Sequence, residues 1–273
     1  MNTQDAKRNF AQVDNSADPQ ILVQYLELTS SLDWMQRLKQ NSFDLMRIKP
    51  GDKVLDLGCG TGEDVRALAT RVGDSGSVVG VDYSKLMVDE ARKRSERLEL
   101  PVEFSTGDAN NLDFGDNTFN SCRAERLLVH LEDPSGVLRE MKRVTKPGGY
   151  VVTLDADWGT ITLDGSDHEL TDKVVRIVSA HIRNGWIGRQ YYGIFKQAGF
   201  EDVTISPGTI PVTDFSLMDR LISLRPSLVL AVEQGILNQS EVDTFLAEME
   251  ERNSKGLFFS SMTGFIACGR KPS

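Results

Sequence analysis

A glycine-rich turn is the stretch of this sequence with the clearest chemical content. Residues 58–62 read GCGTG and follow the short apolar run 53–57. Glycines at this spacing permit positive φ angles and let a ligand lie directly against the backbone. The spacing also approaches the dinucleotide fingerprint G-x-G-x-x-G, but Glu63 stands where the third glycine belongs. The alternative is a plain tight turn that binds nothing.

The residues just after this turn limit the kind of ligand that it suits. Glu63 and Asp64 begin the predicted helix with negative charge. A helix N-terminus that holds a pyrophosphate favours the absence of fixed carboxylates beside it. We therefore expect a ligand with a cationic or zwitterionic part instead of a phosphate.

Two further acidic residues follow the next two apolar segments. Asp82 comes at the end of the run 77–81, where a carboxylate can bind both hydroxyls of a ribose. Asp108 follows the run 102–105, where it can accept a hydrogen bond from an adenine amino group. The alternatives are a helix N-cap for Asp82 and an Asx-turn for Asp108. Ligands of open α/β sheets bind at the carboxyl ends of the strands, so the three patterns together predict one nucleoside site.

The order of elements along the chain explains how these residues would be brought together. Strands alternate with helices, which predicts βαβ units and a mostly parallel sheet with helices on both faces. A final strand after a helical segment suits an antiparallel addition to that sheet. The expected strands are 53–57, 77–81, 102–105, 118–122, 150–154, 203–206 and 257–268, and the expected helices are 18–47, 64–72, 86–98, 134–144, 169–183, 190–197 and 215–252.

Composition narrows the class of protein. The 273 residues carry 31 Lys and Arg against 40 Asp and Glu, so the formal charge is 31 − 40 = −9, which argues against general nucleic-acid binding. No apolar run approaches the roughly 18 residues of a membrane helix, and the N-terminus lacks a signal-like apolar core. Cys59, Cys122 and Cys268 are far apart and form no metal-binding or disulfide pattern. We expect a cytoplasmic monomer or homodimer without metal, membrane or nucleic-acid partners.

Five stretches taken together resemble the class I S-adenosylmethionine-dependent methyltransferases. They are VLDLGCGTG (54–62), VVGVDYS (78–84), GDANNLDF (107–114), FNSCRAERLLVHLEDP (119–134) and KPGGYVV (146–152). The resemblance covers about residues 45–205 and implies a Rossmann-like, seven-stranded sheet whose last strand is antiparallel. It also implies S-adenosyl-L-methionine as cofactor, with S-adenosyl-L-homocysteine as its product.

The resemblance assigns cofactor roles to particular residues. Asp56 and the glycines Gly58, Gly60 and Gly62 would hold the methionine end. Asp82 would bind the ribose, with Tyr83 and Met87 beside the adenosine. Gly107, Asp108 and Ala109 would meet the adenine, the backbone near Arg123 would approach the amino-acid part, and Tyr25 would join from the N-terminal segment.

The remaining segments are expected to select the methyl acceptor. Residues 1–45 would form a helical lid, residues 46–208 and 257–273 the methyltransferase core, and residues 209–256 a helical insertion beside the acceptor. Aromatic and apolar side chains of these parts suit a small apolar or aromatic acceptor, although any one of them can instead be core. Those side chains are Tyr25, Trp34, Trp158, Trp186, Tyr191, Tyr192, Phe215, Met218 and Leu221.

The implied reaction is direct displacement, which needs a base only if the acceptor must lose a proton. His130 lies after the fourth predicted strand, and Asp155 and Asp157 follow the fifth. In some sugar and natural-product O-methyltransferases, a histidine and a carboxylate from these two places form the base. We take His130 and Asp157 as the catalytic candidates, with a structural or pocket-lining role for His130 as the alternative. His168 and His181 are expected to be ordinary packing or solvated residues.

Three functions follow from these patterns. The first is methylation of an O, N or C atom of a small metabolite, because the chain looks nearest to the menaquinone- and ubiquinone-pathway and natural-product methyltransferases. The second is a nicotinamide-dependent oxidoreductase, which Glu63 opposes. The third is a protein that binds S-adenosylmethionine without catalysis.

Overall fold

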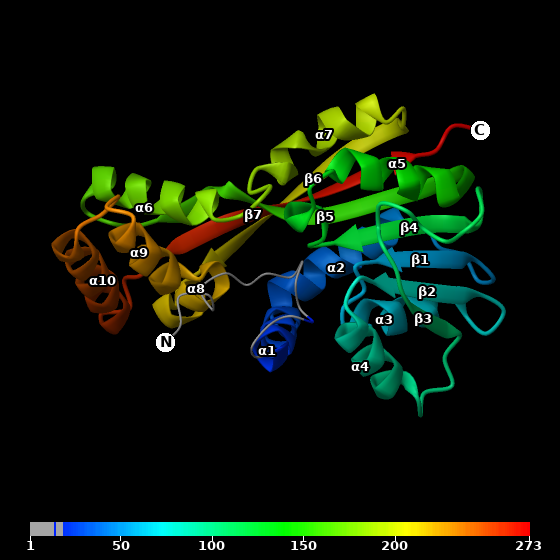
Figure 1. Ribbon diagram of the computed structural model, residues 1–273, viewed down its shortest axis with the longest axis horizontal. Coiled ribbons are helices and arrows are strands. Elements are labelled where there is room, and N and C mark those ends of the chain that lie inside the picture. Colours follow the sequence, from blue (N-terminus) through cyan, green and yellow to red (C-terminus); the bar gives the residue numbers. More distant parts are fainter. Residues whose placement is uncertain (1–13, 15–18) are drawn as a thin grey trace.

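A seven-stranded sheet forms the centre of the protein (Figure 1). The computed structural model describes residue 14 and residues 19–273. The strand order is β3-β2-β1-β4-β5-β7-β6, and β7 runs antiparallel to both of its neighbours while the other pairs are parallel. This confirms the predicted mostly parallel sheet with an antiparallel last strand. The strands are β1 (Lys53–Leu57), β2 (Ser77–Asp82), β3 (Val102–Thr106), β4 (Phe119–Glu125), β5 (Thr145–Leu163), β6 (Glu201–Val212) and β7 (Ser260–Arg270).

Helices cover both faces of this sheet because side chains alternate between the faces along each strand. Val54 packs into one apolar cluster with α3 and α4, whereas its neighbour Leu55 packs into another with α5 and α7. The helices are α1 (Pro19–Ser30), α2 (Asp33–Leu45), α3 (Glu63–Val72), α4 (Lys85–Ser95), the 3₁₀ turn η3 (Leu128–His130), α5 (Pro134–Val144), α6 (His168–Ala180), α7 (Ile187–Gln197), α8 (Phe215–Ile222), α9 (Leu224–Glu233) and α10 (Gln239–Ser254).

Several expected elements differ in extent from the structure, and among them β6 covers residues 201–212 instead of 203–206. The segment 18–47 forms two helices, α1 and α2, and the segment 215–252 forms three, with Ser223 in a left-handed conformation (φ 51°) between α8 and α9. The fifth strand covers residues 145–163 instead of 150–154. It continues because β7 pairs with it from Tyr150 to Leu163, with one register shift after Asp157.

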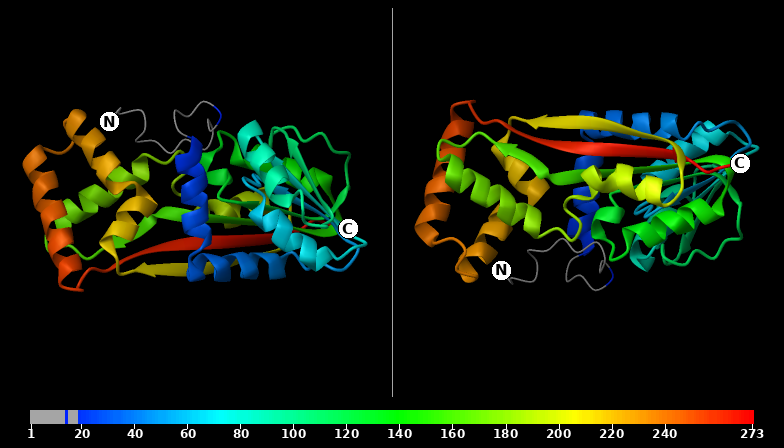
Figure 2. Two further views of the ribbon diagram at one scale, coloured as in Figure 1. Left: turned by 90° about the horizontal axis from the view of Figure 1, so that it is seen from below. Right: turned by 90° about the horizontal axis from the view of Figure 1, so that it is seen from above.

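The long strands β5, β6 and β7 give the molecule an elongated shape. Figure 2 shows α6 and α8–α10 gathered at one end of these strands, with α3 and α4 at the other end and α1 crossing between the two groups. Of the expected lid, residues 1–13 and 15–18 lie outside the described part of the chain. Within that part, no helix combines the length and the apolar character needed to cross a membrane.

Gly62 lets α3 begin close against the sheet. Its φ is 75°, and a Cβ atom at this position would lie 2.6 Å from Phe104 Cε1. Gly62→Ala should therefore lower the free energy of unfolding by about 2–4 kcal/mol, since left-handed strain of about 1–2 kcal/mol adds to overpacking. Urea denaturation measures this loss. Gly235→Ala is the control, because Gly235 has a φ of 69° but no atom within 4 Å of such a Cβ; equal losses in the two variants would contradict the packing argument.

Candidate functional site

A pocket of about 600 Å³ opens at the carboxyl ends of the parallel strands. It brings together nearly all of the residues that the sequence singles out as a cofactor or catalytic site. Those at its wall are Tyr25, Asp56, Gly58, Gly60, Asp82, Tyr83, Met87, Gly107, Asp108, Ala109, Arg123 and His130. Gly62 and Asp157 lie outside the wall.

The glycine turn presents bare backbone to this pocket. The N–H groups of Gly58 and Cys59 donate to the carbonyl of Val81 at 2.7 and 3.0 Å, which fixes the turn against the end of β2. Gly58 has a φ of 74°, and a Cβ atom there would lie 3.1 Å from Leu127 Cδ1. The turn is thus held by its neighbours in a shape that glycine adopts without strain.

Asp82 is already oriented by the backbone around it. One carboxylate oxygen accepts from Gly60 N and the other from Ser84 N, both at 2.9 Å. The helix N-cap alternative is wrong, because Ser84 is the N-cap of α4 and accepts from Met87 N. A carboxylate has about four acceptor sites, so Asp82 keeps acceptor capacity toward the pocket. Burial raises the pKa of Asp82 above its ordinary value.

Asp108 makes the Asx-turn that was the alternative to ligand binding, and it also lines the pocket. Its Oδ1 accepts from the backbone and the side-chain nitrogens of Asn110, at 2.8 and 2.9 Å. The side chain is exposed. The turn therefore fixes the carboxylate at the pocket edge without using its second oxygen.

Arg123 forms the centre of a buried network of charged groups below the pocket. Its Nη1 atom lies 3.1 Å from Asp56 Oδ1 and 2.9 Å from Asp64 Oδ2, and its Nη2 donates to Glu125. Its Nε donates to Ser42 Oγ at 2.9 Å. The side chain is fully buried, so these partners replace the water that the guanidinium loses. The Arg123 side chain is thus used within the protein, and the prediction for this position concerned its backbone alone.

Lys39 extends the network to α2 and α1. Its Nζ donates to Asp64 Oδ1 at 2.8 Å and to Ser30 Oγ at 3.1 Å. Asp64 is therefore compensated by two cations and directed inward. Of the two acids that begin α3, only Glu63 remains partly exposed at the pocket. The prediction of a cationic or zwitterionic ligand rests on two carboxylates at the start of α3. The negative charge there is weaker than the sequence suggests.

The network perturbs its own carboxyl groups in opposite directions. Burial raises the pKa of Asp56 to about 7, helped by the charges of Asp64 and Glu125 and opposed by Arg123. Burial also acts to raise the pKa of Glu125, but Lys39 and Arg123 hold it well below its usual range. The network therefore favours the ionised form of Glu125, whereas burial favours the neutral forms of Asp56 and Asp64.

The structure corrects the prediction that Asp157 acts at the pocket. Its carboxylate accepts from Arg189 Nε and Nη2, both at 2.6 Å, and from Arg189 N at 3.0 Å near the start of α7. Its fourth donor is Gly159 N at 3.0 Å. All of its acceptor sites are thus used to hold α7 on β5. Asp157 lies two residues, about 6.6 Å, farther along the strand than Asp155, which does line the pocket.

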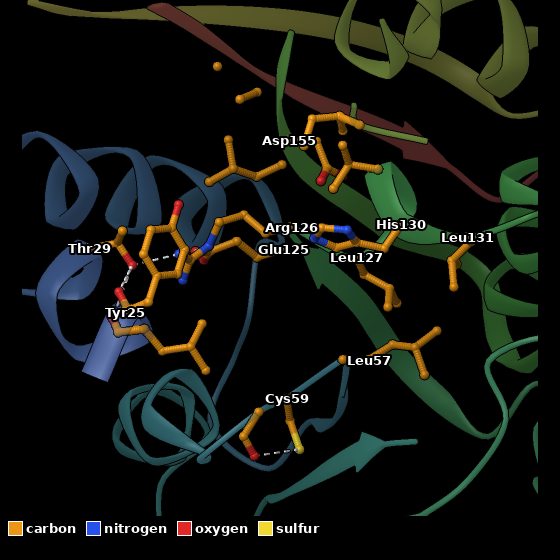
Figure 3. A pocket seen from close by; sticks show the side chains of 18 of the residues that line it. Tyr25, Thr29, Leu57, Cys59, Glu125, Arg126, Leu127, His130, Leu131 and Asp155 are labelled. Atoms are coloured by element: carbon orange, nitrogen blue, oxygen red, sulfur yellow. Dashed lines mark hydrogen bonds and ion pairs between the residues drawn. The ribbon is translucent and has the colours of Figure 1, made fainter. Parts of the chain in front are cut away.

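Asp155 and His130 are two further titratable residues that line the pocket (Figure 3). Tyr191 donates its hydroxyl to Asp155 Oδ2, and the backbone of Val129 also interacts with this carboxylate. Burial raises the pKa of Asp155 to about 7. Burial and the charge of Arg126 lower the pKa of His130 to about 4, so His130 is neutral at pH 7.

The apolar wall combines the N-terminal helices with the segment before β7. Of the expected wall residues, Tyr25, Trp34, Trp158 and Leu221 line the pocket, and Tyr25 Oη donates to Leu221 O at 3.3 Å. The others are placed elsewhere: Phe215, Met218 and Tyr191 are buried in the core, and Trp186 and Tyr192 are exposed on and beside α7.

Several pocket residues were not found by sequence reasoning. Among them are Lys39, Arg126 and His181. The run Arg123–Arg126 (RAER) carried a signal, because three charged residues at the end of a buried strand must have partners. No cluster of His, Cys, Asp and Glu suited to a metal occurs among the described residues.

Comparison with known proteins supports the features described above. Residues 48–199 match the family model of a methyltransferase domain. The chain is 35% identical over 245 residues to an uncharacterized 37.1 kDa protein of a Streptomyces fradiae transposon, covering 89% of this chain and 70% of the relative. It is 32% identical over 195 residues to demethylmenaquinone methyltransferase from Bacillus cereus, covering 66% of this chain and 82% of that enzyme.

Two solved structures share the fold. The YcgJ protein from Bacillus subtilis superposes with a TM-score of 0.62 at 16% identity, covering 87% of this chain and 99% of that one. Phosphoethanolamine N-methyltransferase 2 from Haemonchus contortus, solved with phosphomonomethylethanolamine and S-adenosylhomocysteine, superposes with a TM-score of 0.61 at 18% identity, covering 97% of this chain and 60% of that one. At these identities the likeness concerns the fold alone.

The role of Arg123 can be tested by removing its charge. Arg123→Met leaves three buried carboxyl groups short of a cation and should lower the free energy of unfolding by about 3–5 kcal/mol at pH 7.5. Urea denaturation measures this loss. The control is Arg139→Met, because Arg139 forms an exposed pair with Asp133 at 3.4 Å and should cost less than about 1 kcal/mol. A loss for Arg123→Met as small as that of the control would show that the network is not needed for stability.

The raised pKa of Asp155 predicts a dependence of stability on pH. The carboxyl group of Asp155 keeps its proton up to about pH 7 in the folded state but only to about pH 4 in the unfolded state. The free energy of unfolding of the wild type therefore falls as pH rises from about 4 to about 7. Asp155→Asn removes this dependence. The free energy of unfolding of the variant minus that of wild type should therefore be about 2–3 kcal/mol larger at pH 8 than at pH 5, at about 1.4 kcal/mol per pKa unit. Denaturation at the two pH values checks this, and an unchanged difference would refute the raised pKa.

Proposed function

This chain belongs to the S-adenosylmethionine-dependent methyltransferases, so its cofactor is S-adenosylmethionine, and we propose that its acceptor is a small apolar or aromatic molecule. The observation that carries the proposal is the division of one pocket into two chemically different ends. One end is polar and is formed by the loops after β1, β2 and β3. The other is mainly apolar and is formed by the N-terminal helices, β5, and the segment from β6 to α9.

The polar end fits the parts of the cofactor. Asp82 keeps acceptor capacity for the two ribose hydroxyls, and Asp108 and Ala109 stand where an adenine edge would lie. Tyr83 is 72% exposed beside them and offers a flat face to the adenosine. The bare backbone at Gly58 and Gly60 leaves room for the methionine part, since a side chain at Gly58 would meet Leu127. These residues are our proposed cofactor site, with Asp56, Met87, Gly107 and Tyr25 around them.

The apolar end suggests the class of acceptor. The residues that line it include Leu127, Leu131, Leu154, Trp158, Val178, Ile182, Ile210, Leu221, Ile222, Leu230 and Met262. Most small-molecule sites have such an apolar lining with few polar groups, and those few set the orientation of the ligand. We assign residues 209–256 and the N-terminal helices to acceptor selection because both contribute apolar side chains to this pocket: Leu26, Trp34, Met35 and Leu38 from the helices, and Ile210, Leu221, Ile222 and Leu230 from residues 209–256.

The bound cofactor supplies a methyl group on a positively charged sulfur. Once the methyl group is transferred, the rest of the cofactor leaves as a neutral thioether, which needs no acid. The protein has to exclude water and align the acceptor, and such positioning can lower a barrier by about 7–11 kcal/mol at most. Where the acceptor must lose a proton, neutral His130 is a weak base because its pKa is lowered to about 4. Asp155 is better matched to neutral pH, with a pKa raised to about 7. We therefore replace Asp157 by Asp155 as the carboxylate beside His130.

The oxidoreductase alternative is set aside by the family assignment. The acceptor is tested by incubating the enzyme with methyl-labelled S-adenosylmethionine and a panel of phenols, naphthols, quinols and aromatic amines. Mass spectrometry should find the label on at least one of these compounds. Label found only on nucleic acid or protein would contradict the proposal, and a chain that binds S-adenosylhomocysteine without labelling anything would support the non-catalytic alternative.

The ribose assignment makes a quantitative prediction. Asp82→Ala should weaken the binding of S-adenosylhomocysteine by about 1.5–3 kcal/mol, the scale of hydrogen bonds to a charged group. Calorimetric titration measures this change. Asp133→Ala serves as the control, since Asp133 is an exposed N-cap residue away from the pocket. An unchanged dissociation constant in Asp82→Ala would show that the ribose binds elsewhere.

A further inference from the structure

Arg126 is held in an unusual backbone conformation at the pocket wall. It directly follows β4 and has a φ of 50°, in the left-handed region that non-glycine residues rarely adopt. Its N–H donates to Leu154 O at 2.8 Å, which fixes this conformation against β5. Such strain costs about 1–3 kcal/mol and persists where the surrounding structure enforces it, often at binding sites. Figure 3 shows the side chain reaching toward Tyr25 and Thr29 of α1.

Arg126 differs from the other two cations of the buried network in its access to the pocket. The side chain of Arg126 is 24% exposed, against 4% for Lys39 and 1% for Arg123. Its Nε lies 3.0 Å from Glu125 Oε1, and its Nη1 donates to Thr29 Oγ1 at 2.7 Å. Glu125 also accepts a hydrogen bond from Arg123, so the one carboxylate that Arg126 contacts in this network is shared between two cations. The guanidinium is thus oriented by two contacts while keeping donor capacity toward the pocket.

The charge of Arg126 acts on the inner wall of the pocket. It lowers the pKa of His130, which stays neutral, and it favours the ionised form of Asp155. The surrounding wall is apolar. Leu127 follows Arg126 in the chain, and Leu154 lies beside it on the neighbouring strand β5. A cation in such a setting is stabilised by an anionic oxygen. The planar guanidinium matches a carboxylate in geometry and can also donate to the single oxygen of a phenolate.

We propose that Arg126 binds an anionic oxygen of the methyl acceptor, either a carboxylate or an ionised phenol or enol. This inference rests on the proposed function, because it names the acceptor class of the same pocket. The acceptor would then combine an apolar body, held by the wall described above, with one negatively charged oxygen near β4. Thr29 and Glu125 are positioning residues that hold the guanidinium in place.

The test measures binding without turnover, so that failure of methyl transfer and failure of this inference are distinguishable. The enzyme saturated with S-adenosylhomocysteine is titrated calorimetrically at pH 8 with two matched pairs of probes. The first pair is 2-naphthoate and 2-naphthamide, and the second is 4-nitrophenolate and 4-nitroanisole. Wild type should bind at least one anion about 10- to 100-fold more tightly than its neutral partner, as expected for charge-assisted hydrogen bonds. The pair that shows the preference identifies the source of the oxygen.

The variants assign that preference to Arg126. Arg126→Gln should abolish it while leaving the affinity for the neutral probe and for S-adenosylhomocysteine within about threefold, well below the charge-assisted scale. Arg183→Gln is the matched control: Arg183 is another pocket-lining arginine, paired with Glu132 at 3.0 Å, and its loss should preserve the preference. Arg126→Lys keeps the charge and should keep part of the preference, which covers the case in which Arg126→Gln does not fold.

Three results would overturn the inference. The first is equal affinity of wild type for the anionic and neutral members of both pairs. The second is an Arg126→Gln enzyme that keeps the preference. The third is a loss of affinity for S-adenosylhomocysteine in Arg126→Gln as large as that for the anion, because Arg126 would then bind the carboxylate of the cofactor.

Discussion

The buried guanidinium of Arg123 is the constraint on which the site depends. A fully buried cation must be paired and hydrogen-bonded, and here the partners come from four different elements: α2, β1, α3 and β4. These are the elements that surround the glycine turn. Because the pairing fixes them relative to one another, the same interaction that compensates a charge also sets the shape of the polar end of the pocket.

Two further links connect this network to the helices that we propose select the acceptor. Lys39 and Thr29 join the network to α2 and α1, and Tyr25 joins α1 to the carbonyl of Leu221 in α8. The polar end and the apolar wall of the pocket are thus connected through α1. A polar surface fixed by hydrogen bonds thus adjoins a mainly apolar one, which agrees with our proposal of a common cofactor combined with a specific acceptor.

The sheet was predictable because local patterns determine it: apolar runs of strand length, glycines at the turn, and helices of regular period. The extent of β5 was not, since its continuation to Leu163 depends on pairing with β7, about a hundred residues later. For the same reason Asp157 was misplaced. It lies about 6.6 Å beyond Asp155 along the same strand, but its partner Arg189 lies on α7, and no spacing in the sequence reveals that contact. Asp82 was predicted correctly as a pocket residue because the end of a strand is a local feature.

The central claim is that the loops after β1, β2 and β3 hold the cofactor while β4, β5 and the helices around them hold the acceptor. A crystal structure with S-adenosylhomocysteine tests it most directly. We expect the ribose hydroxyls within hydrogen-bond distance of Asp82, the adenine beside Asp108 and Ala109, and the homocysteine part over Gly58 and Gly60, with Arg126 and Asp155 left facing open space. A ligand whose ribose does not contact Asp82, or whose carboxylate binds Arg126, would contradict this division of the pocket.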